Sequence, residues 1–138
     1  MKIFAVGWNY NSHNKEMDNT LVLNEPVIFL KPESAILKDG KPFFYPDWSS
    51  QIEYEAEIVV RIDRLGKNIQ SKFAYRYYNS YTIGIDFTAR DYQAKARANG
   101  NPWDISKGFD GSAVVGDFIP TNGEKLGEKE VFLPINGN

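Results

Sequence analysis

The chain has 138 residues, of which 42% are hydrophobic and 25% charged, as in an ordinary folded domain. Its formal net charge of −2 and dispersed basic residues give no electrostatic footprint for nucleic acid, and the absence of cysteine excludes disulfides, thiolate metal sites and cysteine nucleophiles. No apolar run approaches the ~20 residues that cross a bilayer. We therefore expect one cytoplasmic domain over residues 1–138, without a nucleic-acid or membrane partner.

Short strands are predicted for the first third of the chain. Residues 3–8 form a strand candidate, and residues 26–30 form an apolar run. Asp39-Gly40 is a turn signal, and residues 41–45 after it are expected to be extended.

Residues 52–62 give the clearest strand pattern. The even positions are apolar, whereas the odd positions include Glu53, Glu55 and Glu57. A period of two places these carboxylates on one face of the strand and a core-forming apolar row on the other.

The next segments are predicted to be a helical connection over residues 74–80 and a strand over residues 81–87, with Asp86 near its end. A helix follows, because Thr88 and Asp91 fit a capping box and Gly100 is a stop signal.

The last third is predicted to be mixed and β-prone over residues 107–119, with a further strand over residues 130–135. That strand runs into Asn136-Gly137, the strongest short signal for a hairpin turn. A hairpin turn joins two strands, and only the first of them is predicted before the chain ends, so the pattern indicates truncation.

Three carboxylates are candidate metal ligands. Glu55 and Glu57 project from one side of their strand, and Asp86 ends a neighbouring one; hard cations such as Mg²⁺ take oxygen ligands of this kind. The alternative for the glutamates is a solvated strand face. For Asp86, in a largely apolar run, the alternative is a cap on the following helix, since a buried carboxylate needs a partner or a metal.

Arg90 and Gln93 fall at i and i+3 near the start of the predicted helix, where an anionic ligand is favoured, and Arg97 extends the same face. This arrangement suits a substrate carboxylate or an oxyanion. The alternative is an exposed polar helix face.

Two further candidates carry proton or charge chemistry. His13 is followed three residues later by Glu16, and a carboxylate beside an imidazole can orient a general base that activates water. Lys107 is a candidate electrophile that stabilises negative charge. The alternatives are a chance surface pair and an exposed lysine.

The ordered set of motifs resembles the fumarylacetoacetate hydrolase family over nearly the whole chain. In chain order the matching segments are Val6-Gly7-Trp8-Asn9-Tyr10 with His13 and Glu16, Phe29-Leu30-Lys31-Pro32, Tyr54-Glu55-Ala56-Glu57, Gly84 to Gln93, and Lys107-Gly108-Phe109-Asp110. The stretch from Asp86 to Gln93 is the most specific of them.

The resemblance implies a role for each matching residue. It implies that the carboxylates of Glu55, Glu57 and Asp86 bind Mg²⁺ or Mn²⁺, with Ca²⁺ as a substitute. It implies that His13 and Glu16 form the dyad that activates water. The substrate oxygens would be held, and charge stabilised, by Arg90, Gln93 and Lys107. Lys31 also matches a family motif, as a structural or substrate-adjacent residue.

The activity implied by the resemblance is metal-dependent cleavage of a carbon–carbon bond in a β-diketo or β-keto acid, by acylpyruvate-type hydrolysis or oxaloacetate decarboxylation. The alternatives are isomerisation of 2-hydroxy-diene-dioates and an inactive chain that only binds metal or a small keto acid. A homodimer is expected.

The implied fold is α+β and β-rich, a mixed β-sheet roll with few short helices. Family members continue beyond this chain with further strands and a Gly-Asp…Thr-Gly-Thr-Pro motif. We therefore expect a partial catalytic core that is incomplete at its C-terminus.

Overall fold

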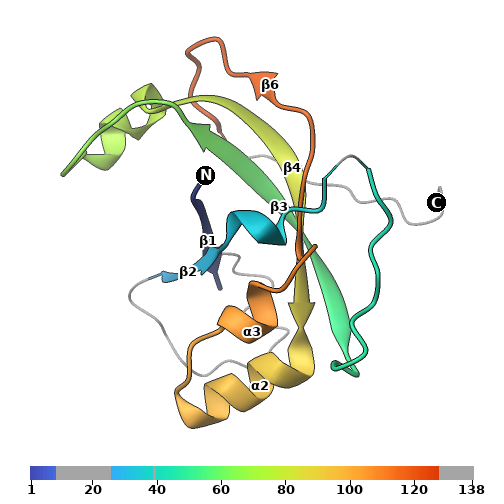
Figure 1. Cartoon of the computed structure of the whole chain (residues 1–138). Coiled ribbons are helices and arrows are strands. Elements are labelled where there is room, and N and C mark those ends of the chain that lie inside the picture. Colours follow the sequence, from blue (N-terminus) through green and yellow to red (C-terminus); the bar gives the residue numbers. More distant parts are fainter. Residues whose placement is uncertain (9–25, 39, 128–138) are drawn as a thin grey trace.

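The computed structural model describes residues 1–8, 26–38 and 40–127, and it has two antiparallel sheets (Figure 1). β1 pairs with β2 in a two-stranded sheet, while the larger sheet has the order β3-β4-β5, with β6 also pairing with β4. The strands are β1 (Ile3–Gly7), β2 (Val27–Lys31), β3 (Ile52–Ile62), β4 (Tyr78–Ala89), β5 (Ala113–Val115) and β6 (Ile119–Pro120). The helices are η1 (Glu33–Ala35), η2 (Ser71–Arg76), α2 (Arg90–Asn99) and α3 (Asp104–Lys107). This is the predicted α+β, β-rich class, although within the described residues the sheets do not close into a barrel.

The long β3–β4 hairpin is the frame of the molecule. The strand predicted over residues 52–62 is confirmed with the same bounds, and it pairs with β4 from Ile52↔Ala89 to Ile62↔Tyr78. Residues directly opposite each other in an antiparallel pair share a face of the sheet. The glutamate face of β3 therefore lies beside the alternate residues of β4 that include Asp86.

The two α-helices lie together at the end of β4 (Figure 1). α2 follows β4 without a loop and ends at Gly100, whose left-handed φ of 66° confirms the predicted stop. The predicted capping box is wrong: Ala89 is the N-cap, and it makes no side-chain cap. Thr88 still belongs to β4, and Asp91 instead accepts hydrogen bonds from the Ser49 hydroxyl and the Ser50 backbone amide.

Other predicted elements differ in detail. The connection before β4 is the 3₁₀ helix η2, which ends at Arg76, so β4 begins at Tyr78. Residues 41–45, predicted only to be extended, belong to no helix or strand. The β-prone segment 107–119 contains the end of α3 and the short strands β5 and β6. The strand and turn predicted after residue 127 lie outside the described residues.

The buried face of the larger sheet is the polar one. Along β4 the buried positions alternate from Ser80 through Thr82, Gly84 and Asp86 to Thr88, and the last residue, Ala89, is buried as well. On the other face Tyr54, Ile62 and Ile83 are 50%, 65% and 47% exposed. The apolar row of residues 52–62 was predicted to form a core, and within the described chain it does so only in part. Phe87, opposite Tyr54 on this face, stacks on Phe43 with ring centroids 4.0 Å apart, whereas Tyr54 and Ile62 stay exposed.

Among the described residues, the buried apolar ones are small and lie near the helix-bearing end of β4. They are Ala35, Ala89 and Ala113. Ala113 in β5 also forms a parallel bridge with Ile36, directly after η1. This bridge holds the segment after β2 beside β5, and β5 pairs with β4. The end of β2 therefore lies close to the polar face of β4. None of the described helices is long and apolar enough to cross a membrane.

Candidate functional site

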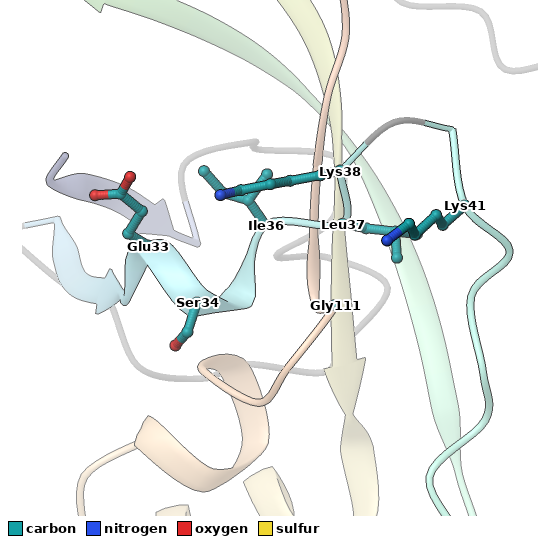
Figure 2. Close-up of a pocket in the computed structure, with 7 residues that line it drawn as sticks. All are labelled: Glu33, Ser34, Ile36, Leu37, Lys38, Lys41 and Gly111. Carbon is teal, nitrogen blue, oxygen red and sulfur yellow. The ribbon is translucent and has the colours of Figure 1, made fainter.

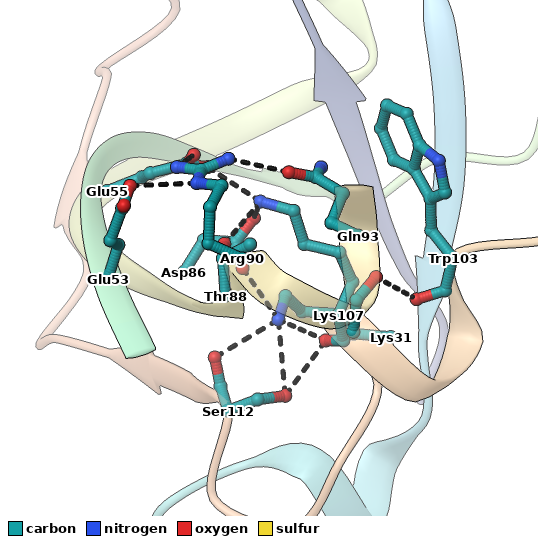
Figure 3. Close-up of polar contacts among 11 residues, drawn as sticks. Lys31, Glu53, Glu55, Asp86, Thr88, Arg90, Gln93, Trp103, Lys107 and Ser112 are labelled. Atoms are coloured by element: carbon teal, nitrogen blue, oxygen red, sulfur yellow. Dashed lines mark hydrogen bonds and ion pairs between the residues drawn. The ribbon is translucent and has the colours of Figure 1, made fainter. Parts of the chain in front are cut away.

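A cluster of buried charges lies where β2, β3, β4, α2 and α3 meet (Figure 3). Its members, called here the carboxylate–lysine cluster, are Lys31, Glu55, Asp86, Arg90 and Lys107. They come from five different elements, so the cluster exists only in the folded chain. Four of the predicted site residues are in it.

Asp86 lies between two ammonium groups. Its Oδ2 atom is 2.8 Å from Lys107 Nζ, and its Oδ1 atom is 2.7 Å from Lys31 Nζ. Oδ1 is buried and accepts no hydrogen bond from the described residues, so its contact with Lys31 is an ion pair without hydrogen-bond alignment. Asp86 is therefore not a helix cap; it is a buried carboxylate held by two lysines.

Lys107 uses its ammonium group fully. Nζ donates to Glu55 Oε2 at 2.7 Å, to Asp86 Oδ2 at 2.8 Å and to Thr88 Oγ1 at 2.6 Å. These three acceptors match the three donors of an ammonium. Lys107 is 2% exposed, so the alternative of an exposed lysine is wrong.

Arg90 joins the cluster from the first turn of α2. Its Nη2 donates to Glu55 Oε1 at 2.7 Å and its Nε to Glu53 Oε2 at 2.8 Å. Nη1 donates to Gln93 Oε1 at 2.6 Å, so Arg90 and Gln93 lie on one helix face as predicted. The guanidinium thus connects the half-buried Glu55 to the more exposed Glu53.

Burial and charge act in opposite directions on the ionisable groups. Burial alone would raise the pKa of Glu55, but the Lys107 ammonium and the Arg90 guanidinium outweigh it and lower that pKa. Burial would likewise lower the pKa of Arg90, but Glu55 and Glu53 raise it. For Lys31, burial lowers the pKa despite its contact with Asp86. The three carboxylates, Glu53, Glu55 and Asp86, are therefore balanced in charge by three cations. These are Lys31, Arg90 and Lys107.

The predicted metal ligands are brought to one region. Glu55 lies directly opposite Asp86 in the β3–β4 register, and Glu57 lies opposite Gly84 on the same face. Within the residues that the structure describes, however, no group of three or more His, Asp or Glu side chains is arranged to hold a metal ion. Instead, the Lys107 ammonium lies between Glu55 and Asp86.

The remaining predicted residues have different outcomes. His13 and Glu16 lie outside the described residues. Arg97, on the last turn of α2, has its guanidinium carbon 5.0 Å from the centre of the Trp8 ring.

Two polar residues of the site were missed by sequence reasoning, and the role of Lys31 was left open. Lys31 shares a strand face with Phe29, so the period of two in β2 was the signal that it points inward. Thr88 lies two residues after Asp86 in β4, so the period of two likewise indicated that it shares the face of Asp86. Ser112, which contacts Lys31, lies in a loop where the sequence gives no comparable signal.

A separate hollow of about 370 Å³ lies on the surface around η1 (Figure 2). It is lined by Glu33, Ser34, Ile36, Leu37, Lys38, Lys41 and Gly111. None of the predicted site residues is among them. The carboxylate–lysine cluster, which holds four of the predicted site residues, is therefore the candidate functional site.

Among the proteins that resemble this chain in sequence are two mitochondrial enzymes of oxaloacetate. It is 40% identical to the mitochondrial oxaloacetate decarboxylase of Dictyostelium discoideum, over 99% of this chain and 63% of that protein. It is 37% identical to the mitochondrial oxaloacetate tautomerase of Rattus norvegicus, over 98% of this chain and 61% of that protein. The chain thus spans less than two thirds of the length of these relatives.

The fold resembles solved structures of the same group. A fumarylpyruvate hydrolase from Pseudomonas aeruginosa, in complex with Mn²⁺ and pyruvate, superimposes with a TM-score of 0.82 and 32% identity over 88% of this chain and 54% of that one. The family model described as the fumarylacetoacetate (FAA) hydrolase C-terminal region matches residues 2–138. The chain therefore belongs to the fumarylacetoacetate hydrolase family.

Proposed function

We propose that this chain carries the metal-binding and charge-stabilising part of an enzyme that cleaves carbon–carbon bonds in β-keto or β-diketo acids with the help of a divalent cation. The substrate class is that of oxaloacetate and the acylpyruvates. The names of the relatives, an oxaloacetate decarboxylase and a fumarylpyruvate hydrolase, support this class of chemistry.

The observation that carries the proposal is the juxtaposition of the half-buried Glu55 with the buried Asp86 and Lys107. Two carboxylates that face each other across a hairpin would repel, and here a buried ammonium lies between them. Buried ionisable groups with several charged partners are typical of functional sites. A purely structural sheet would cover this face with apolar side chains at lower desolvation cost.

The donor chemistry fits a hard divalent cation. Glu55, Glu57 and Asp86 supply carboxylate oxygens from one sheet face, and the buried Oδ1 of Asp86 has no hydrogen bond from the described residues. When bound there, Mg²⁺ or Mn²⁺ would act as a Lewis acid that polarises the substrate's keto oxygens. The Mn²⁺ complex of the Pseudomonas aeruginosa enzyme supports a divalent ion of this type.

The cationic side chains would act on the substrate directly. Lys107, buried beside the carboxylates, would stabilise the negative charge that develops on a substrate oxygen as the bond breaks. Arg90 and Gln93 would bind the substrate carboxylate, with the planar guanidinium suited to a bidentate contact. To do so, Arg90 would exchange part of its contact with the half-exposed Glu53, which is the least buried of its partners.

Water activation is assigned to His13 and Glu16. This part of the proposal depends on the family resemblance of their motif. In hydrolysis the imidazole would take a proton from water while Glu16 orients the ring. Decarboxylation needs no such water, so the dyad should matter more for acylpyruvates than for oxaloacetate.

The proposal is tested by turnover of oxaloacetate and acetylpyruvate by the purified chain with Mg²⁺, with Mn²⁺ and with EDTA. We expect metal-dependent product formation that EDTA abolishes. His13→Ala should reduce acetylpyruvate hydrolysis far more than oxaloacetate decarboxylation. A folded chain that binds Mn²⁺ and turns over neither substrate would contradict the proposed enzymatic activity. It would support the alternative of a non-catalytic binding protein.

Keto–enol tautomerisation is a second candidate, favoured by the name of the rat relative. Both reactions pass through an enolate, that of pyruvate in decarboxylation and that of oxaloacetate in tautomerisation, and the same charges would stabilise either one. The two are separated by following the enol absorbance of oxaloacetate and the release of pyruvate in parallel. Loss of the enol without pyruvate would identify a tautomerase.

We also propose that the chain forms a homodimer. The outer face of the β1–β2 sheet pairs Phe4 with Leu30 and Val6 with Ile28, and these side chains are 43–64% exposed. Exposed apolar patches of this kind mark interaction surfaces. Light scattering should give twice the 15.7 kDa mass of the chain, and a stable monomer at micromolar concentration would contradict the proposal.

A further inference from the structure

Lys31 is almost completely buried although it is the last residue of β2, where the chain turns toward η1. It is 4% exposed. Its Nζ atom lies 2.7 Å from Asp86 Oδ1, 3.1 Å from the carbonyl oxygen of Ser112 and 3.2 Å from Ser112 Oγ, and it also donates to the carbonyl oxygen of Lys107 (Figure 3). One ammonium thus contacts three separate parts of the chain.

These contacts fix the loop that begins with Lys107. The Ser112 hydroxyl donates to the Lys107 carbonyl oxygen at 2.9 Å, so both ends of the loop meet at the Lys31 ammonium. α3 has four residues, too few to hold the orientation of its last residue by itself. Lys31 therefore acts on Asp86 directly and on Lys107 through its backbone carbonyl.

Lys31 does more than complete the balance of three cations and three carboxylates. Lys107 Nζ lies 2.8 Å from Asp86 Oδ2, and Lys31 Nζ lies 2.7 Å from Oδ1. Two ammonium groups on opposite oxygens restrict the rotation of the carboxylate.

We propose that Lys31 is a positioning residue: it sets the orientation of the Asp86 carboxylate and the course of the loop that starts at Lys107. Asp86 is one of the three carboxylates assigned to the divalent ion, so this inference builds on the proposed function. Lys31 acts through these two residues and needs no contact with the metal or the substrate.

The first test is the affinity for Mn²⁺, measured by isothermal titration calorimetry on the whole chain with Lys31→Met. Removal of a cation near the metal ligands would by Coulomb's law strengthen Mn²⁺ binding. A positioning role predicts the opposite sign, and we expect binding to weaken at least tenfold. Equal or tighter binding would overturn the proposal. The matched control is Lys38→Met, because Lys38 is exposed and has no contact with the cluster; it should leave the affinity unchanged.

A second test needs no metal. The melting temperature is measured for Lys31→Met, for Asp86→Asn and for the double variant. If Lys31 acts on Asp86, the Lys31→Met change should lower the melting temperature at least twice as much in the wild-type background as in the Asp86→Asn background. Equal shifts in the two backgrounds would overturn the proposal.

The tests remain decisive where a variant misfolds or the metal does not bind. If Lys31→Met is unfolded, a folded double variant supports the coupling, and an unfolded double variant contradicts it. If the wild-type chain binds no Mn²⁺, the proposed metal chemistry fails, while the role of Lys31 is decided by the melting temperatures.

Discussion

Glu55 and Asp86 lie directly opposite each other on β3 and β4, and the Lys107 ammonium bridges them, 2.7 Å from Glu55 Oε2 and 2.8 Å from Asp86 Oδ2. Lys107 lies 52 residues from the first carboxylate and 21 from the second. The bridge therefore forms only when α3 packs against the hairpin. Each of the three side chains contributes to both the stability of the fold and the chemistry of the site.

Asp86→Asn should destabilise the chain by about 3–5 kcal/mol, because it leaves Lys31 and Lys107 buried with an uncharged neighbour. Urea unfolding measures this change. The control is Asp117→Asn at an exposed aspartate, which should stay within about 0.5 kcal/mol of the wild type. An Asp86→Asn variant as stable as the control would show that the ion pairs are not formed in solution.

Lys107→Met should destabilise the chain by a similar ~3–5 kcal/mol, since two facing carboxylates and Thr88 lose their shared donor. If Lys107 also stabilises charge on the substrate, the rate of turnover should fall about 100-fold in the protein that remains folded. The exposed Lys67 provides the control, Lys67→Met. If Lys107→Met turns over substrate at the wild-type rate, Lys107 takes no part in the catalytic mechanism.

The lowered pKa of Glu55 predicts how stability depends on pH. A carboxylate whose pKa is lower in the folded than in the unfolded chain contributes stability that is complete above the unfolded value of about 4.3. That contribution is lost as the pH falls through the lower, folded value. The difference in unfolding free energy between wild type and Glu55→Gln should therefore be largest near pH 7 and should narrow below about pH 4.

Urea unfolding of both proteins between pH 3 and pH 7 checks this dependence. Glu124→Gln, at an exposed position, should differ from the wild type equally little at every pH. A Glu55→Gln difference that is constant over this range, or that grows on acidification, would contradict the assigned ion pairs.

Gly84→Ala should destabilise the chain by about 1–3 kcal/mol through overpacking. A Cβ atom at Gly84 would lie 2.7 Å from the Val114 carbonyl oxygen and 2.7 Å from Val59 Cγ2. The oxygen belongs to the backbone of β5 and cannot move without disturbing its pairing with β4. Gly127→Ala is the control, since no atom of the other described residues lies within 4 Å of a Cβ built at that position. Equal melting temperatures for the two variants would argue against the β4–β5 register.

The sequence predicted the features that depend on neighbouring residues. Alternation along residues 52–62 gave the bounds of β3, and Gly100 ended α2 because its left-handed conformation suits a residue without a side chain. Alternation also separated the two faces of β3. It could not say which face is covered, because that depends on elements distant in the chain, and the polar face is the buried one.

The contacts of the site were less accessible to prediction. Family resemblance named Asp86 and Lys107, but the contact between Lys31 and Asp86 joins residues 55 positions apart through the β2–η1 turn. The capping-box signal of Thr88 and Asp91 failed because β-sheet pairing continues to Ala89 and competes with helix initiation. Local propensity was thus overridden by a longer hydrogen-bonded ladder.

The most direct test of the account is a Mn²⁺ titration of the wild-type chain and of Glu57→Gln by isothermal titration calorimetry. Glu57 shares the sheet face of Glu55 and Asp86 but takes no part in the Lys107 contacts described above, so its substitution probes metal binding with the bridge intact. We predict one Mn²⁺ per wild-type chain, binding at least tenfold weaker in Glu57→Gln, and no change in the exposed control Glu124→Gln. A folded wild-type chain that binds no Mn²⁺, or a Glu57→Gln variant that binds it as tightly, would contradict the assignment of this face as a metal site.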